Sequence, residues 1–413
     1  MDRFAECFED LPDPRADNAL HDLTELLFIA LMATLCGATS CTDMALFARL
    51  KAYLWQDMLE LKHGLPSHDT FSRVFRMLDP QAFETAFRRF MEAFAKGAKI
   101  ARPKGVIALD GKALRRGYER GKSHMPPVMV TAWAAQTRMA LANVLAPNNN
   151  EVAGALQLLE LLQLKGCVVT ADALHCHRGM AKQILERGGD YVLAVKENQP
   201  ALLADAKTAI AAAERKGKTP VTTTDADHGR KEKRGALVAP VKEMAQKHDF
   251  PGLKAVARIS NKRGKDKTIE RYFLMSQNYS SEQVLRIVRT HWSIENSLHW
   301  PLDVTLDEDL ARNRKDNGPA NLAVLRRLAL NVARAHPDTT TSLRLKLKRA
   351  GWNDAFLFEL IAHMRLPCPQ GEGETQFRVL ATGHVRGLQD RSAPKEEGAG
   401  KTGCALHPRS RVH

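Results

Sequence analysis

Hydrophobic residues in the first hundred positions recur with the 3.6-residue period of α-helices. Phe71, Phe75 and Leu78, for example, fall at i, i+4 and i+7, which places them on one helical face. We therefore predict an all-α N-terminal domain over residues 1–98. Its helices are expected at residues 20–35, 43–54, 67–78 and 82–94.

The predicted helix over residues 67–78 carries Arg73 and Arg76 on its outer, polar face. Two helices joined by a short turn, with arginines on one face, are typical of helix-turn-helix DNA readers. A small helical bundle with solvated arginines has the same pattern. The sequence leaves both interpretations open.

Near residue 104 the pattern changes to short, apolar, β-branched runs that alternate with helices. Three consecutive strands are followed by helix, strand, helix and strand, an order typical of a ribonuclease-H-like mixed sheet. We therefore predict a mixed α/β fold with such a core over residues 99–367. The strands are expected at residues 106–109, 128–135, 140–145, 168–171 and 191–195, and the helices at residues 151–164 and 180–186.

Residues 201–280 interrupt this alternation with short β-like runs around charged turns, which predicts a β-rich insertion. The stretch holds 17 Lys and Arg against 9 Asp and Glu, so it supplies +8 of the formal net charge of +14. A local excess of this kind favours a surface that follows phosphates. With a pI near 9.5, it indicates a nucleic-acid partner.

The C-terminal third is predicted to be helical. A helix is expected over residues 282–300, with Ser280 and Gln283 at the spacing of a capping box and Pro301 limiting its far end. Further helical segments are expected at residues 320–335 and 340–366. Residues 368–413 contain seven glycines and no periodicity, so we expect a disordered tail there.

Several classes of protein are excluded by what the sequence lacks. The seven cysteines show no zinc or disulfide spacing, and the first residues have no signal-peptide pattern. The longest apolar run, residues 26–38, is too short to span a bilayer. P-loop, GxGxxG and GxSxG motifs are absent. We expect a cytoplasmic, nucleoid-associated protein without a membrane partner.

Two acidic residues end apolar strands: Asp110 follows residues 106–109, and Asp172 follows residues 167–171. A carboxylate in such a place is costly unless a cation or hydrogen-bond donors meet it. Glu295 falls on or beside the apolar stripe of its helix, so we expect it to face inward. Three carboxylates suit Mg²⁺ or Mn²⁺, which prefer oxygen ligands. The sequence therefore predicts a metal site for phosphodiester chemistry.

Neighbouring residues add alternatives and further expectations. Lys112, Arg115 and Arg116 follow Asp110 and are expected to contact phosphates. The third metal ligand has rivals in a nearby acidic segment, although its context favours Glu295. These rivals are Asp303, Asp307, Glu308 and Asp309.

Aromatic and imidazole side chains also invite functional interpretations. His175, Cys176 and His177 are adjacent and cannot easily converge on one tetrahedral ion, so zinc is not expected. His291 and Trp292 are candidates for contact with DNA, the latter through stacking on an unpaired base. Packing in the helix core is the more frequent fate of such a tryptophan.

At these residues the chain resembles the DDE-type insertion-sequence transposases, in the branch that includes the H-repeat-associated proteins. The resemblance covers about residues 8–365. Its specific stretches include IALDGKALR, GGDYVLAVKENQ and HWSIENSLHWPLDV. It implies a transposase-associated helical domain, then a ribonuclease-H-like catalytic domain with a β insertion. The family's three metal-binding acids fall on Asp110, Asp172 and Glu295.

The resemblance implies metal-dependent DNA strand cleavage and strand transfer at the ends of an insertion sequence, with two Mg²⁺ or Mn²⁺ ions. The implied partners are terminal repeats, target DNA and a second copy of the chain. In the wider insertion-sequence group Tyr, Arg and Lys flank the glutamate, whereas Val288, His291 and Leu302 stand here, a feature of the subtype. Members normally end near the last predicted helix, so the tail lies outside the pattern.

Two other functions stay open at this point. A DNA-binding protein without catalysis would occupy repeat ends and never cut them. A simple nuclease would cut but never join. Both would share the basic charge, and only the first could dispense with the acidic trio.

Overall fold

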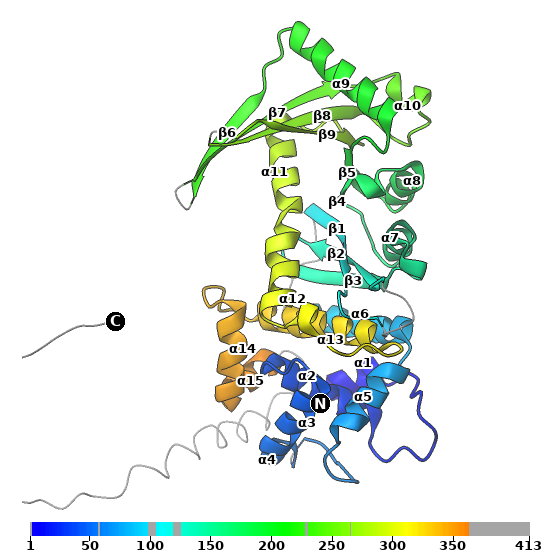
Figure 1. Ribbon diagram of the computed structural model, residues 1–413, viewed down its shortest axis with the longest axis vertical. Helices are drawn as coiled ribbons and strands as arrows, with labels where there is room; N and C mark the ends of the chain where they lie inside the picture. Colours follow the sequence, from blue (N-terminus) through cyan, green and yellow to red (C-terminus); the bar gives the residue numbers. More distant parts are fainter. Residues whose placement is uncertain are drawn as a thin grey trace, which may run out of the picture. The chain divides into compact units, whose positions relative to one another are not determined.

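Nine strands build one mixed sheet within the part of the chain that the structure describes. The computed structural model describes residues 2–56, 58–97, 105–118, 125–227, 230–264 and 266–362. The strand order is β3-β2-β1-β4-β5-β9-β8-β7-β6 (Figure 1). The strands are β1 (Gly105–Ala113), β2 (Val128–Ala134), β3 (Met139–Leu145), β4 (Cys167–Ala171), β5 (Asp190–Val195), β6 (Val221–Asp227), β7 (Arg230–Pro240), β8 (Ala255–Arg263) and β9 (Ile269–Met275).

The first five strands confirm the runs predicted from apolar, β-branched residues. β1, β2 and β3 form antiparallel pairs, whereas β1 pairs in parallel with β4, and β4 with β5. A parallel pair needs a crossover connection, and helices α7 (Glu151–Glu160) and α8 (Arg178–Glu186) supply the two that are required. β1 therefore lies between an antiparallel and a parallel neighbour.

Alternate residues of β1 are buried on opposite faces of the sheet, as the two-residue period of a strand requires. Ile107 and Leu109 join the apolar core beneath α7 and α8. Val106 and Ala108 face the other side, where α11 (Ser281–His291) and α13 (Gly318–Ala335) pack. In Figure 1 α11 runs along the sheet on the side opposite α7 and α8. The face that carries α11 is the one on which the candidate site lies.

The N-terminal helices pack around α13, and together they share one hydrophobic core with the outer strands β2 and β3. Buried amides of α13 meet backbone groups that would otherwise be unpaired. Asn331 bonds both the N–H and the C=O of Ala140 on the edge strand β3, and Asn321 donates to the carbonyls of Phe75 and Leu78. The N-terminal helices are α1 (Asp2–Phe8), α2 (Leu23–Leu35), α3 (Cys41–Leu50), α4 (Ala52–Trp55), α5 (His68–Met77) and α6 (Pro80–Gly97).

Helix α2 accounts for the longest apolar run of the sequence. Eleven of its thirteen residues are buried, because other helices surround it on several sides. Asp22 caps its first turn by accepting a hydrogen bond from the N–H of Glu25. Within the described ranges no helix is both long and apolar enough to cross a membrane.

The predicted β-rich insertion needs two corrections. Residues Pro200–Arg215 form a 16-residue helix, α9, because Pro200 occupies its first turn and Leu202 and Ile210 bury one face. The four strands that follow extend the main sheet, since β9 pairs antiparallel with β5 through Val195 and Tyr272. This pairing covers the edge that β5 would otherwise expose.

The last helical region is divided where one helix was predicted. α14 (Leu343–Trp352) and α15 (Asp354–Ile361) meet at Asn353, whose side chain accepts a hydrogen bond from the N–H of Phe356 and so starts a new helix. The predicted disordered tail, residues 368–413, lies outside the described residues.

Candidate active site

Asp110 lies on β1, and Asp172 directly follows the last residue of β4, the neighbouring parallel strand. Ala108 of β1 pairs with Thr170 of β4, so the residues two positions further along each strand lie at the same level. Alternation directs them to the face on which Thr170 contacts His291 of α11. The pairing brings the ends of these two strands to the same edge of the sheet.

The third acid lies on a helix that begins as predicted and continues further than predicted. Ser280 and Gln283 form the capping box at the start of α11. Pro301 was expected to limit the helix, but it occupies the first turn of α12 (Trp300–Val304), which continues directly from a π-helical turn over Glu295–His299.

Two contacts and one missing donor explain this π-helical turn. The N–H of Trp300 donates to the carbonyl of Glu295, the i→i+5 pattern of a π-helix. Pro301 has no N–H, so it leaves the carbonyl of Ser297 without its helical donor. The guanidinium of Arg334, on α13, donates to that carbonyl instead. The turn is therefore held from outside the helix.

The turn brings Glu295 and His299 beside Asp110. The Nδ1 atom of His299 lies 3.4 Å from Oε2 of Glu295 and 3.6 Å from Oδ2 of Asp110. One donor atom from each residue lies within 4.8 Å of the others, a geometry that could hold a metal ion. The prediction that Glu295 faces inward is wrong, since 51% of its side chain is exposed. Its carboxylate borders the site from the solvent side.

The carboxylates of this group are unequal. Burial raises the pKa of Asp110 to about 6, and the negative charges of Glu295 and Glu151 act in the same direction, against the effect of His299. A hydrogen bond with His299 lowers the pKa of Glu295 despite partial burial. Asp110 is thus the acid whose ionised form most needs a cation nearby.

Asp172 lies at this edge of the sheet but outside the group of three donors. Its carboxylate accepts a hydrogen bond from the N–H of Leu174 and so begins a short 3₁₀ turn. His291, bonded to Thr170 through Nδ1 at 3.0 Å, lies near enough to feel the charges of Asp172 and Glu295. Burial lowers the pKa of His291 to about 4 in spite of those charges. The neutral imidazole faces the acids.

Sequence reasoning missed a fourth carboxylate. Glu151, at the start of α7, packs against Gly111, where an added Cβ would lie 2.3 Å from the Glu151 Cδ atom. Its Oε1 is 3.0 Å from Nε2 of His175, which is fully buried. The glycine that follows Asp110 was a signal of close approach, but its partner is 40 positions away along the chain. His175 thus pairs with a carboxylate.

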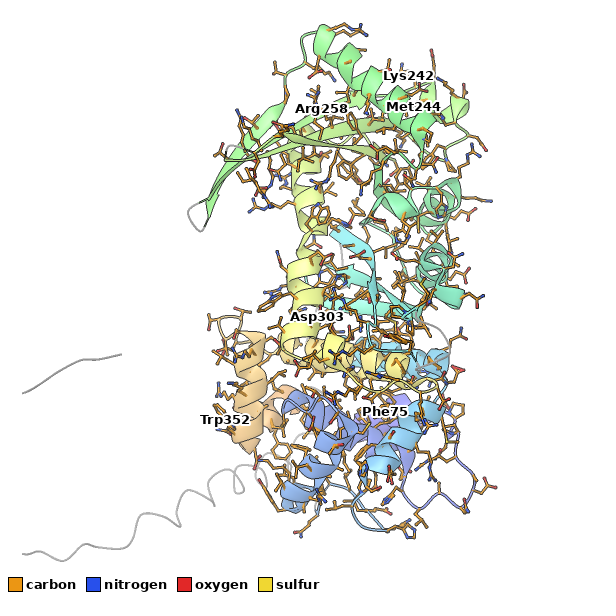
Figure 2. The ribbon with its side chains drawn as sticks, viewed as in Figure 1. Phe75, Lys242, Met244, Arg258, Asp303 and Trp352 are labelled. Carbon is orange, nitrogen blue, oxygen red and sulfur yellow. The ribbon has the colours of Figure 1, made fainter. Side chains whose placement is uncertain are left out.

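Lys112 lies in a buried ionic cluster two residues beyond Asp110. Its Nζ atom is 2.7 Å from Asp303 and 3.0 Å from Asp309. Asp303 belongs to α12 and is labelled in Figure 2. Arg115, largely exposed, approaches Asp309 at 3.2 Å, and Arg116 is exposed. A phosphate contact by Lys112 stays a prediction, and its ion pairs argue against it.

The rival third ligands have other partners or places. Asp303 and Asp309 pair with Lys112, while the buried Glu308 lies 2.8 Å from the guanidinium of Arg327. Asp307 begins the short turn that contains Glu308. None of these four acids belongs to the donor group found among the described residues, which favours Glu295 as the acid beside Asp110.

The remaining candidates for DNA contact lie at the surface. On α5, Arg73 is exposed, and the guanidinium of Arg76 forms an ion pair of 2.7 Å with Asp316. This contact ties α5 to the segment before α13 and leaves both interpretations of the helix open. Trp292 is 46% exposed, with the guanidinium of Arg271 at 5.4 Å from the ring centroid. Core packing is therefore not its role.

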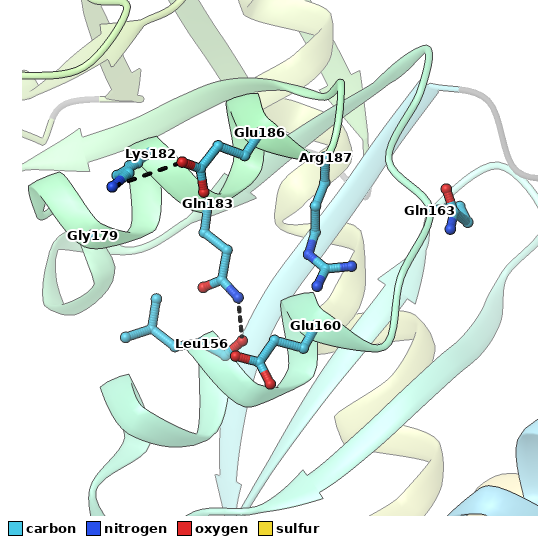
Figure 3. A pocket seen from close by; sticks show the side chains of 8 residues that line it. All are labelled: Leu156, Glu160, Gln163, Gly179, Lys182, Gln183, Glu186 and Arg187. Carbon is cyan, nitrogen blue, oxygen red and sulfur yellow. Dashed lines mark hydrogen bonds and ion pairs between the residues drawn. The ribbon is translucent and has the colours of Figure 1, made fainter.

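A surface pocket lies away from these acids, between α7 and α8 (Figure 3). Gln183 of α8 donates across it to the carbonyl of Leu156, and Lys182 pairs with Glu186 along the helix. Its lining has no carboxylate from the candidate site. The lining residues are Leu156, Glu160, Gln163, Gly179, Lys182, Gln183, Glu186 and Arg187.

Comparison with known proteins identifies the family of the chain. The family model of the "Transposase DDE domain" matches residues 101–332, and that of the "DDE_Tnp_1-associated" domain matches residues 5–91. The chain is 38% identical over 62% of its length to an "Uncharacterized protein in dhlA 3'region" of Xanthobacter autotrophicus, of which 87% is covered.

Two relatives in Escherichia coli carry more specific names. "Putative transposase YncI" of strain O157:H7 is 30% identical over 85% of this chain and 92% of its own. "H repeat-associated putative transposase YhhI" of strain K12 is 26% identical over 88% of this chain and 98% of its own. The acids described above lie inside the region that the DDE-domain model matches. The chain belongs to the DDE-domain transposase family, as the resemblance of its sequence to the H-repeat-associated branch predicted.

Proposed function

We propose that this protein catalyses DNA strand cleavage and strand transfer at the ends of an insertion sequence, with Asp110, Asp172 and Glu295 as its catalytic acids. One observation carries the proposal. Asp110 lies on β1 and Asp172 directly follows β4, the adjacent parallel strand, while the carboxylate of Glu295 lies beside Asp110 on the π-helical extension of α11. The order β3-β2-β1-β4-β5 supports a ribonuclease-H-like core, and residues 1–98 and 201–280 would be its helical and basic additions.

Membership of this family implies the use of a divalent metal, and the residues present fit such an ion. Carboxylate oxygens dominate the donors, as Mg²⁺ and Mn²⁺ require. The raised pKa of Asp110 reflects buried negative charge that a cation would relieve. Asp110, Glu295 and Asp172 would hold two ions, which when bound activate a water molecule and neutralise the leaving oxygen.

The chain's own groups orient the reactants. Asp110 lies on a strand with paired neighbours on both sides, so its carboxylate moves little. The hydrogen bond between His291 and Thr170 fixes a neutral imidazole beside Asp172. Arg115 and Arg116, exposed in the turn that follows β1, would hold the phosphates on either side of the cut.

DNA and a second copy of the chain are the proposed partners. The basic strands β7 and β8 present lysines and arginines that would follow the duplex backbone. Arg73 and Arg76 of α5, or the insertion itself, would contribute to recognition of the terminal repeats. Pairing of two element ends would call for a dimer.

A cleavage assay tests the proposal. The substrate is a plasmid that carries the gene with its flanking DNA, incubated with the full chain and Mg²⁺ or Mn²⁺. We expect nicking by the wild type, none by Asp110→Asn, Asp172→Asn or Glu295→Gln, and wild-type nicking by Glu160→Gln, which removes an acid from the remote pocket. Equal nicking by all four variants would overturn the assignment.

The same assay separates the two other functions. Covalent joining to a second plasmid distinguishes a transposase from a nuclease that only cuts. A wild-type protein that binds the flanking DNA, with or without metal, and never nicks it would be a DNA-binding protein without catalysis.

A further inference from the structure

A histidine lies between two of the acids that the proposed function assigns to catalysis. Only 8% of the surface of His299 is exposed, so it is as buried as a core residue. Its Nδ1 atom faces Glu295 and Asp110 at 3.4 and 3.6 Å. A histidine that served only to fill space would have no reason to direct this atom at both carboxylates.

The helix reaches this geometry through an irregular turn. Glu295 and His299 are the first and last residues of the π-helical turn. Single π-helical turns within α-helices are frequent at functional sites. Arg334 holds the turn from α13, and Pro301 prevents the Ser297 carbonyl from returning to regular helical pairing. The turn therefore depends on a contact with a second helix, and this contact fixes the position of His299.

The other ring nitrogen of His299, Nε2, is buried and makes no hydrogen bond to the described residues. Without an ion, Nδ1 carries the proton that it donates to Glu295. Because Nε2 makes no bond, the ring proton can move to Nε2, and this change of tautomer would free the lone pair of Nδ1. In that tautomer an imidazole lone pair and two carboxylates would converge on one space, a set of donors that a cation would satisfy together.

We propose that His299 supplies a nitrogen ligand, through Nδ1, to the ion held between Asp110 and Glu295, and that this site therefore binds Mn²⁺ more tightly than Mg²⁺. The inference rests on the metal site of the proposed function and adds a ligand to it. Mg²⁺ is a hard ion that sheds its water reluctantly and prefers oxygen. First-row transition metals accept imidazole readily, so a nitrogen donor raises their affinity selectively.

Pulsed electron paramagnetic resonance of bound Mn²⁺ tests this directly, because it detects the ¹⁴N nucleus of a coordinated imidazole. The full chain is loaded with Mn²⁺ in the absence of DNA. We expect ¹⁴N modulation in the wild type and its loss in His299→Gln and His299→Asn. His291→Gln is the matched control: it removes the other histidine of this helix, which is bonded to Thr170, and should keep the modulation.

Affinity measurements complete the test. We expect His299→Gln to weaken Mn²⁺ binding by about tenfold or more, the scale of losses at metal sites, and to change Mg²⁺ binding, measured by competition, far less. Equal losses for both ions would overturn the proposal. So would a wild-type spectrum without ¹⁴N modulation, which needs no variant to be folded, or modulation that disappears in His291→Gln and persists in His299→Gln.

Failure of the proposed function would look different. A wild type that binds Mn²⁺ with ¹⁴N modulation but never nicks DNA would refute the cleavage activity and support the nitrogen ligand. Asp110→Asn that retains the wild-type Mn²⁺ spectrum would refute both.

Discussion

Replacement of Lys112 by methionine distinguishes a structural role for this residue from the phosphate contact that the sequence predicted. The ammonium group is buried, with Asp303 at 2.7 Å and Asp309 at 3.0 Å. Methionine keeps most of the side-chain volume and removes the charge. Two carboxylates, one on α12 and one in the 3₁₀ turn that follows it, would then lie near each other without a cation.

The magnitude follows from the burial of the partners. Removal of one member of a fully buried ion pair costs about 3–5 kcal/mol, and of an exposed pair about 0–1 kcal/mol. The side chain of Lys112 is 8% exposed, and those of Asp303 and Asp309 are 28% and 18% exposed. Because the carboxylates retain some hydration, we expect Lys112→Met to lower the free energy of unfolding by roughly 2–3 kcal/mol.

Urea unfolding measures this loss of stability. The salt dependence of DNA affinity tests the alternative, a contact between Lys112 and a DNA phosphate. A lysine that contacts one phosphate contributes about 0.9 to the slope of log K against log salt. We expect Lys112→Met to leave that slope unchanged. Arg116→Met, which removes an exposed charge from the same segment, should unfold within about 0.5 kcal/mol of the wild type. The reasoning is refuted if Lys112→Met unfolds like the wild type and its salt slope falls by about one phosphate contact.

Three further variants test buried polar groups. Burial raises the pKa of Glu84 to about 8 from near 4.5, so the folded chain holds a proton that the unfolded chain has lost. The free energy of unfolding should therefore fall as pH rises from near 4.5 to about 8, by up to about 1.4 kcal/mol per pH unit. Glu84→Gln should remove this pH dependence, which urea titrations at several pH values would measure. Arg327→Met should lower the free energy of unfolding by about 3–5 kcal/mol, because it leaves Glu308 buried without its cation. The double variant with Glu308→Leu should recover most of this loss. A double variant as unstable as the single one would contradict the reasoning. Gly111→Ala should displace Glu151, whose Cδ would lie 2.3 Å from the new Cβ, and lower the melting temperature, while an unchanged melting temperature would show that the glutamate is free to move.

The strands that carry the two aspartates could be predicted because their signals are local. Apolar, β-branched runs such as that before Asp110 predict buried strands whatever surrounds them, and Asp172 ends a run of the same kind. The capping box at Ser280 is equally local, since both of its partners lie within one helical turn. The pairing of β1 with β4, by contrast, has no local signal and was expected only through the analogy with a ribonuclease-H-like sheet.

What could not be predicted depends on contacts between distant parts of the chain. The π-helical turn needs Arg334, which lies 37 positions beyond the carbonyl that it meets. From the sequence alone, Pro301 predicts the end of a regular α-helix. On such a helix Glu295 would face the apolar core, whereas in the structure half of its side chain is exposed. The pairs of Glu151 with His175 and of Lys112 with Asp303 likewise form only once the sheet has assembled.

The helix α9 is a different kind of error, because its signal was present. Residues Pro200–Arg215 are rich in alanine and begin with proline, both of which favour a helix. The β-like runs that follow it led the whole stretch to be treated as one β-rich unit. Because β9 pairs with β5, the strands of the predicted insertion belong to the same sheet as the core.

Anomalous diffraction from crystals of the full chain soaked in Mn²⁺ tests most directly whether the acids form one metal site. We predict anomalous difference peaks between Asp110 and Glu295 and beside Asp172, at the same edge of the sheet, with each carboxylate in contact with an ion, and no such peaks in Asp110→Asn crystals. Mn²⁺ bound only elsewhere on the protein, or a carboxylate of Asp172 that remains turned away from the ions, would contradict the account.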